Sequence, residues 1–145
     1  MYIEVKRCKD DVLAEKLLDA ASFYGSALLS RQMRPYIEIE IKILKTLRDD
    51  GQCSCEEYNM RDRPRGFSIA IADRLSEEEK LLTLAHEMVH VKQFAVGELN
   101  DDQTRWQKSK IAEDIPYLDL PWEVEARCLE YVLYDMYQQH INRQS

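Results

Sequence analysis

Two histidines four positions apart constrain this chain more than any other feature of its sequence. The segment from His86 to His90 reads His-Glu-Met-Val-His, which is an H-E-x-x-H pattern. In a helix, positions four apart lie on one face, so both imidazoles can reach a single metal ion. Glu87, next to the first histidine, can then take a proton from a metal-activated water. The sequence therefore predicts a helix here, with His86 and His90 as metal ligands and Glu87 as general base.

The residues around the motif support a buried helix. Ser76 and Glu79 form a capping-box pattern that starts a helix, and Gly97 is suited to end it. Apolar residues surround the motif at Leu81, Leu82, Leu84, Ala85, Met88 and Val89. Because an unpaired ionisable group is costly to bury, a ligand role explains the two histidines better than a chance surface placement.

A catalytic zinc site takes three protein ligands and leaves one position for water. Some zincins continue the motif as H-E-x-x-H-x-x-G-x-x-H. In this chain Gln93 occupies the position of the glycine, and Val96 occupies the position of the third histidine. That three-histidine pattern is therefore excluded. His140 is the remaining histidine and the least favoured candidate for the third ligand.

Two glutamates at the start of the last predicted helix are better placed to complete the site. Glu123 shares a helix face with Ala126, whose small side chain permits a close approach to the motif helix. This arrangement favours Glu123 as the third ligand. Glu125 remains the alternative, either as ligand or as a group that orients a histidine or Arg127.

The remaining pattern predicts an α+β fold. Alternating strands are expected at 2–7, 37–43 and 67–72, and residues 52–59 are expected to return as the second arm of a hairpin. Helices are expected at 11–28, 76–94 and 122–141, with a short helix near 101–111. The turn signal Asp49-Asp50-Gly51 favours a hairpin between the second and third strands. We expect a small, mostly antiparallel sheet packed against an N-terminal helix, the motif helix and a C-terminal ligand helix. Residues 1–145 are expected to form one domain.

Composition restricts the partners and the compartment. A net charge of -7 and a pI near 5.0 argue against nucleic acid, and the arginines at 61, 63 and 65 are expected in a solvated loop. No apolar run reaches the ~20 residues that cross a bilayer. Without a signal-peptide pattern, we expect a cytoplasmic protein of a bacterium or of a phage-infected host cell. Inert thiols are expected at Cys8, Cys53, Cys55 and Cys128.

The residues at 86–93, His-Glu-Met-Val-His-Val-Lys-Gln, and at 121–127, Pro-Trp-Glu-Val-Glu-Ala-Arg, resemble compact gluzincin-type zinc metallopeptidases of phages and bacteria. Those proteins pair H-E-x-x-H with a later E-x-x-A or E-x-E-A helix, and the resemblance covers roughly residues 67–134. It implies a minimal zincin-like core, a Zn²⁺ cofactor and hydrolysis of peptide bonds with Glu87 as general base. It also implies a protein or peptide substrate, bound as an extended strand along the edge strand 67–72.

Two functional classes follow from these observations. The first is an active zinc peptidase, in which Tyr117, Tyr131 or Tyr134 would stabilise the oxyanion of the reacting carbonyl. The second is a zincin-like metal-binding module that acts by protein–protein interaction or regulation without proteolysis. The intact Glu87 favours the enzyme, because a structural metal site has no need of a general base.

Overall fold

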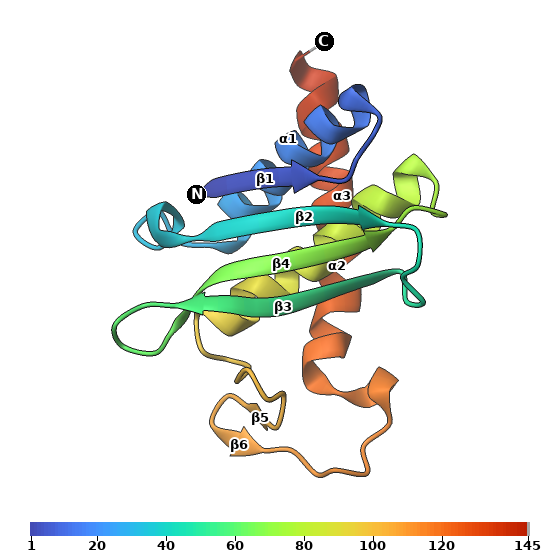
Figure 1. The fold of residues 1–145 in the computed structure, drawn as a ribbon. Helices are drawn as coiled ribbons and strands as arrows, with labels where there is room; N and C mark the ends of the chain where they lie inside the picture. The colour runs from blue at the N-terminus through green and yellow to red at the C-terminus, as the bar shows by residue number, and fades with distance from the viewer. Residues whose placement is uncertain (145) are drawn as a thin grey trace.

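The computed structural model describes residues 1–144 and consists of a sheet with helices packed on one face (Figure 1). The elements in chain order are β1 (Tyr2–Lys6), α1 (Asp11–Leu28), η1 (Arg34–Tyr36), β2 (Glu38–Leu44), β3 (Gly51–Tyr58), β4 (Pro64–Ala72), α2 (Glu77–Ala95), β5 (Arg105–Trp106), β6 (Ser109–Lys110), η2 (Tyr117–Asp119) and α3 (Pro121–Gln144). The expected α+β class is confirmed. Within residues 1–144, no helix combines the length and the apolar character that crossing a membrane requires.

The main sheet is mixed, whereas a mostly antiparallel sheet was expected. Its strand order is β1-β2-β4-β3. The pairs β1–β2 and β2–β4 are parallel, and only β3–β4 is antiparallel. The difference arises because α1 lies between β1 and β2 in the chain, so the chain crosses back before β2 begins in the same direction as β1.

The predicted hairpin between the second and third strands is wrong, because β3 pairs with β4 instead. The hairpin turn lies at residues 59–63, where the Asn59 side chain accepts from the backbone amide of Arg61 at 2.9 Å. Strand β4 buries Phe67, Ile69 and Ile71, so it suits the interior of the sheet better than β3, with its exposed Gln52 and Ser54.

This order also corrects the expectation that 67–72 is an edge strand for substrate. These residues belong to β4, which has β2 on one side and β3 on the other. Its backbone donors and acceptors are therefore already paired, and an extended peptide cannot add to it. The free edges of the sheet are β1 and β3.

The core lies between the sheet and the helices. The alternating isoleucines of β2 (Ile39, Ile41 and Ile43) are buried, as predicted, and each contributes roughly 1.5–3 kcal/mol by leaving water. Two tyrosines tie the helices together. The hydroxyl of Tyr24 in α1 donates to the carbonyl of Leu81 in α2 at 3.1 Å, and that of Tyr137 in α3 donates to Asp19 at 2.8 Å.

The termini of α2 follow the sequence prediction. The Ser76 hydroxyl accepts from the Glu79 amide at 3.1 Å, and the Glu79 carboxylate accepts from the Ser76 amide at 3.0 Å, which completes the capping box. The helix ends just before Gly97, which has a φ of 82°. The capping box and the glycine therefore set the length of the helix that carries the motif.

A short hairpin replaces the helix expected near 101–111. Strands β5 and β6 pair through Arg105–Lys110 and Trp106–Ser109. Gln107 and Lys108 between them have φ of 50° and 74°, as a two-residue hairpin turn requires. The segment between α2 and α3 thus turns back on itself instead of forming a helix.

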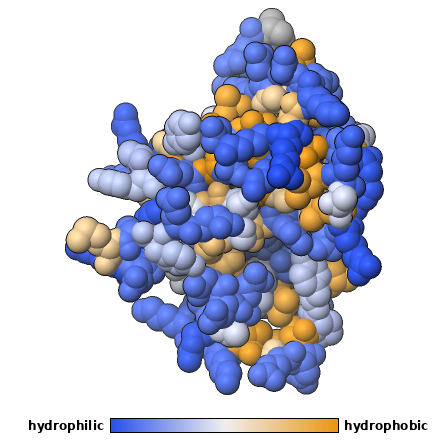
Figure 2. Space-filling model, in the orientation of Figure 1, coloured by the Kyte–Doolittle hydropathy of each residue, from blue (hydrophilic) through white to orange (hydrophobic). Residues whose placement is uncertain are grey.

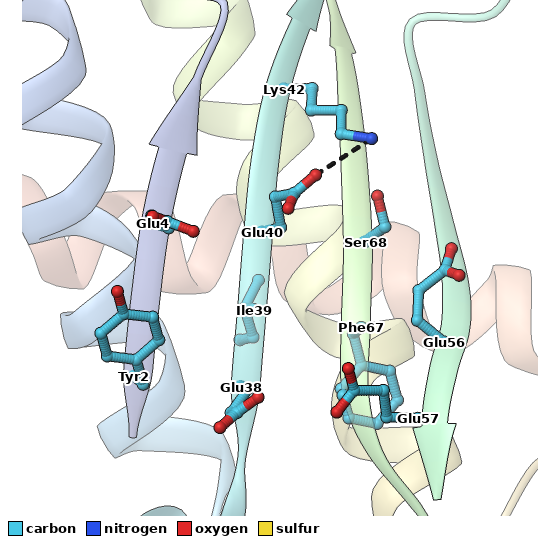
Figure 3. Close-up of a pocket in the computed structure, with 11 residues that line it drawn as sticks. Tyr2, Glu4, Glu38, Ile39, Glu40, Lys42, Glu56, Glu57, Phe67 and Ser68 are labelled. Carbon is cyan, nitrogen blue, oxygen red and sulfur yellow. Dashed lines mark ion pairs between the residues drawn. The ribbon is translucent and has the colours of Figure 1, made fainter.

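The face of the sheet opposite the helices is open and mostly hydrophilic (Figure 2). A hollow of about 310 Å³ on this face is lined by a set of glutamates, Glu4, Glu38, Glu40, Glu56 and Glu57 (Figure 3). Lys6 and Lys42 pair with Glu40 at 2.9 and 3.0 Å. We call this region the open face.

Candidate metal centre

Helices α2 and α3 bring together the three residues predicted as ligands. His86 Nε2 lies 3.0 Å from Glu123 Oε1, and His90 Nε2 lies 3.1 Å from Glu123 Oε2. One ligand atom from each residue lies within 4.8 Å of the other two. Because Glu123 is in the first turn of α3 and the histidines share one face of α2, the cluster depends on the packing of the two helices.

The cluster could hold a metal ion, as both the donor set and the spacing show. Two imidazole nitrogens and a carboxylate oxygen are ligands that transition metals accept in proteins. With metal–ligand bonds of about 2.1 Å, tetrahedral coordination separates the ligand atoms by ~3.4 Å. The separations of 3.0 and 3.1 Å to the carboxylate are close to that value. A small adjustment of the side chains would therefore be enough to admit an ion.

Charge balance holds the cluster together in the metal-free protein. Burial opposes ionisation of Glu123, but hydrogen bonds from His86 and His90 outweigh it and hold the pKa of this carboxyl well below its usual range. Burial lowers the pKa of His86, but the hydrogen bond to Glu123 and the nearby carboxylate of Glu130 raise it to about 10. Against the effect of burial, the ionised carboxylate of Glu123 thus raises the pKa of both imidazoles, and a metal ion would compete with protons for their ring nitrogens.

Glu87 lies beside the cluster without being part of it. Its side chain is 6% exposed, and it lines two adjoining cavities that also share Gly51 and Tyr117. Burial raises the pKa of Glu87 to about 7, although the nearby His90 and His86 act in the opposite direction. A carboxyl with a pKa near 7 can both accept and return a proton at neutral pH.

Gly51 allows the first residue of β3 to approach Glu87. A Cβ at position 51 would lie 2.5 Å from Thr83 Cγ2 and 3.1 Å from Glu87 Oε1. The first distance is far below van der Waals contact, so only glycine fits this position without a shift. The sequence predicted a turn at Gly51, and this close contact with the motif helix is an additional role that the turn signal did not reveal.

The carboxylates that flank the cluster have separate roles. Glu125, the alternative ligand, lies outside the cluster and accepts from the Gln93 side chain at 3.1 Å. Glu130 lies 3.6 Å from His86 Nδ1 and was not singled out in the sequence. It is seven positions after Glu123, on the same face of α3, and that spacing was the signal available for it.

Of the three tyrosines proposed as oxyanion donors, Tyr117 lies at the site. Burial raises the pKa of its hydroxyl, as does the nearby carboxylate of Glu123, and its side chain lines both cavities beside Glu87. The Arg127 guanidinium donates to the carbonyl of Leu118 and so holds η2, which carries Tyr117, against α3. Tyr131 is exposed on α3, and Tyr134 lies near Glu78 and Lys16, away from the cluster.

The cavities beside Glu87 form a cleft along β3. One has a volume of about 280 Å³ and is lined by Cys53, Ser54 and Phe94 among others. The other measures about 580 Å³ and includes Thr83 and Arg127. Both contain Gly51, Glu87 and Tyr117, so the cleft passes directly over the candidate general base.

His140 and the cysteines do not take part in the cluster. The His140 ring lies 4.9 Å from that of Phe23, at the other end of α3 from Glu123. All four cysteines are free thiols, as predicted, and none belongs to the metal-binding group. Cys53 lines the smaller cavity, where burial raises the pKa of its thiol.

Comparison with known proteins gives no relative for this chain. No family model matches the sequence, and neither a curated protein nor a solved structure is significantly similar to it. The candidate function therefore depends on the residues and the geometry of the site.

Proposed function

We propose that the protein is a gluzincin-type, zinc-dependent peptidase in which Glu87 is the general base. The observation that carries this proposal is the position of Glu87, a buried carboxyl that faces a cleft beside a three-residue metal-binding cluster. A structural zinc site is closed by four protein ligands and has no use for such a carboxyl. A catalytic site needs both the open coordination position and the base.

Zinc is the metal that the donor set favours. Two histidines and one glutamate form the ligand set of several zinc peptidases, with the fourth position left for water or substrate. When bound, zinc supplies Lewis acidity and lowers the pKa of water towards ~7. The tautomer of each histidine is set by the partner of its Nδ1 atom. That partner is Glu130 for His86 and Gln93 for His90.

Residues of the chain would move the protons and stabilise the developing charge. Glu87 takes a proton from the attacking water and returns it to the amine of the cleaved bond. Its pKa of about 7 suits both transfers. The Tyr117 hydroxyl donates to the carbonyl oxygen as that atom becomes negative. Tyr117 lines both cavities that contain Glu87, so its hydroxyl is on the side of the cluster where the substrate would bind.

The proposed substrate is a protein segment in an extended conformation, bound along the free edge of β3. Gly51, Cys53 and Ser54 of this strand line the same cavity as Glu87, and β3 is paired on one side only. Its unpaired backbone groups can therefore bind an added strand. The register of β3 with β4 is regular from Gly51 to Cys55 and shifts after Cys55, which limits the straight edge to this stretch.

Substitution of Glu87 by glutamine tests the proposal. Glutamine has the same shape but cannot accept the proton, so we expect hydrolysis to fall by about 10²–10⁴-fold. Zinc content should remain that of the wild type, because Glu87 is not a ligand. Cleavage of a denatured protein is followed by mass spectrometry, and zinc is measured by elemental analysis on the same preparations.

The matched control is Glu78→Gln, an exposed glutamate on the same helix. It should hydrolyse the substrate at the wild-type rate. His86→Ala should lose zinc and activity together. If wild type and Glu87→Gln cleave equally well, or if neither cleaves, the peptidase proposal fails and the non-proteolytic metal-binding module is favoured.

A further inference from the structure

Gln93 is a buried glutamine on α2 whose side chain is completely occupied by hydrogen bonds. It has no exposed surface and lies three positions after His90, on the same helix face. Its Oε1 lies 2.7 Å from His90 Nδ1. Its Nε2 donates to the carbonyl of Trp122 at 3.0 Å and to Glu125 Oε1 at 3.1 Å. The amide therefore joins a predicted ligand on α2 to the first turn of α3.

These contacts allow one orientation of the amide. The carbonyl of Trp122 and the carboxylate of Glu125 are both acceptors, so the NH₂ group of Gln93 must face them. The amide oxygen then faces His90 and accepts its Nδ1 proton. Consequently the other ring nitrogen of His90, Nε2, points towards Glu123 and lies 3.1 Å from its Oε2. The orientation of His90 thus depends on acceptors that lie on the other helix.

We infer that Gln93 is a positioning residue that sets two of the three metal ligands at once. It fixes the ring of His90 directly, and it fixes Glu123 through the carbonyl of the adjacent Trp122. This inference rests on the proposed metal site. Among residues 1–144, the contact that His86 makes through Nδ1 is weaker, because this nitrogen lies 3.6 Å from the partly exposed Glu130. The geometry of the cluster is therefore more sensitive to Gln93 than to Glu130.

Substitution of Gln93 by methionine removes the amide but keeps the length and flexibility of the side chain. Removal of a residue that orients a metal ligand lowers the affinity for metal by about 10–100-fold. We expect the zinc affinity of Gln93→Met to fall by this factor. It is measured by competition with a chromophoric chelator. The absorption bands of bound Co²⁺ should also shift, because they report ligand geometry, which a loss of packing alone would leave unchanged.

Two further variants complete the series. Glu125→Ala removes one of the two acceptors that orient the amide, so it should weaken zinc binding by less than about tenfold. Gln139→Met is the matched control, because Gln139 is exposed in the C-terminal half of α3. Its zinc affinity and Co²⁺ spectrum should equal those of the wild type. The expected affinity for zinc is therefore highest in Gln139→Met, lower in Glu125→Ala and lowest in Gln93→Met.

NMR of the metal-free protein tests the same contact without an ion. In the wild type the Nδ1 proton of His90 should exchange slowly with water, and in Glu125→Ala and Gln93→Met it should exchange faster. A folded Gln93→Met with wild-type zinc affinity and Co²⁺ spectrum would overturn the inference. If Gln93→Met does not fold, unchanged exchange in Glu125→Ala overturns it.

The outcomes separate this inference from the proposed function. A wild type that binds zinc but shows no hydrolysis dependent on Glu87 would refute the peptidase and leave the order of zinc affinities intact. A peptidase with unchanged affinity in Gln93→Met would refute only the role of Gln93.

Discussion

Carboxylates gather at two places in this protein, the metal centre and the open face of the sheet. On the open face, Glu40 accepts from Lys6 and Lys42 at a surface that water reaches, and these pairs contribute little to folding because solvent screens them. At the metal centre, Glu123 is 4% exposed and contacts two imidazoles. The same chemical group therefore marks a solvated surface in one region and a candidate metal site in the other, and burial distinguishes them.

The largest expected effect is a loss of zinc affinity when a glutamate of the metal centre is neutralised, compared with the same change on the open face. Glu123→Gln keeps the size of the side chain but removes an anionic ligand, so zinc affinity should fall by more than the ~100-fold that loss of an orienting partner costs. Glu40→Gln should leave zinc affinity unchanged. Competition with a chelator measures both. Equal zinc affinities for the two variants would contradict the role of Glu123 as a metal ligand.

Removal of zinc should destabilise the protein through the metal centre alone. An ion present at 100 times its dissociation constant adds about 2.7 kcal/mol to the free energy of unfolding. For a chain of this size, loss of that energy corresponds to a drop of roughly 5–10 °C in melting temperature. A chelator should produce this drop in the wild type and in Glu40→Gln, measured by calorimetry. If a chelator lowered the melting temperature of Glu123→Gln by the same amount, the ion would be bound at another site.

Glycines at the two regions provide a comparison of packing. An alanine at Gly51 would contact Thr83 at 2.5 Å, and one at Gly66 on the open face would contact the Glu57 side chain at 2.8 Å. Both substitutions should reduce the free energy of unfolding by about 1–3 kcal/mol, as overpacking does. Only Gly51→Ala should also lower the rate of hydrolysis, because it displaces Glu87. Denaturant titration and a peptide-cleavage assay separate the two effects.

A separate effect should appear in the pH dependence of the protein without metal. The pKa of His86 rises from 6.5 to about 10 on folding, so its protonated form stabilises the folded state fully below pH 6.5. That contribution is lost as the pH rises through 10. His86→Asn should therefore flatten the decline in the free energy of unfolding between these values, and His140→Asn should not. Urea titrations across the range measure it.

The three residues that could hold a metal ion could be predicted as a cluster because their signals are local. His86, Glu87 and His90 form one helical turn, and Glu123 was favoured through the small residue that shares its face. Gln93 and Glu130 were missed, although helical periodicity places each on the face of a ligand. Both can be recognised only after the partner helix is known, because each contacts a residue or a backbone group on the other element.

The sheet was harder to predict because its order depends on competition between strands. Alternation located β2 and β4, and the turn signal located β3, but neither showed which strand would occupy the interior. The turn signal at Asp49-Asp50-Gly51 favoured a hairpin, yet the apolar β4 pairs with both neighbours and leaves the polar β3 at the edge. The position of a substrate strand changed accordingly, from residues 67–72 to the edge of β3.

The ligands of the metal centre come from two helices, with His86 and Glu123 separated by 37 positions in sequence. An ion bound to both would close the intervening chain into a loop, as a covalent cross-link does. Closing a loop of this length removes conformational entropy from the unfolded chain worth about 4 kcal/mol in the chain-entropy model. The hairpin β5–β6 and η2 lie inside that loop. Separation of α2 from the first turn of α3 would then be coupled to release of the ion, so the two ends of this loop would stay together for as long as the metal is held.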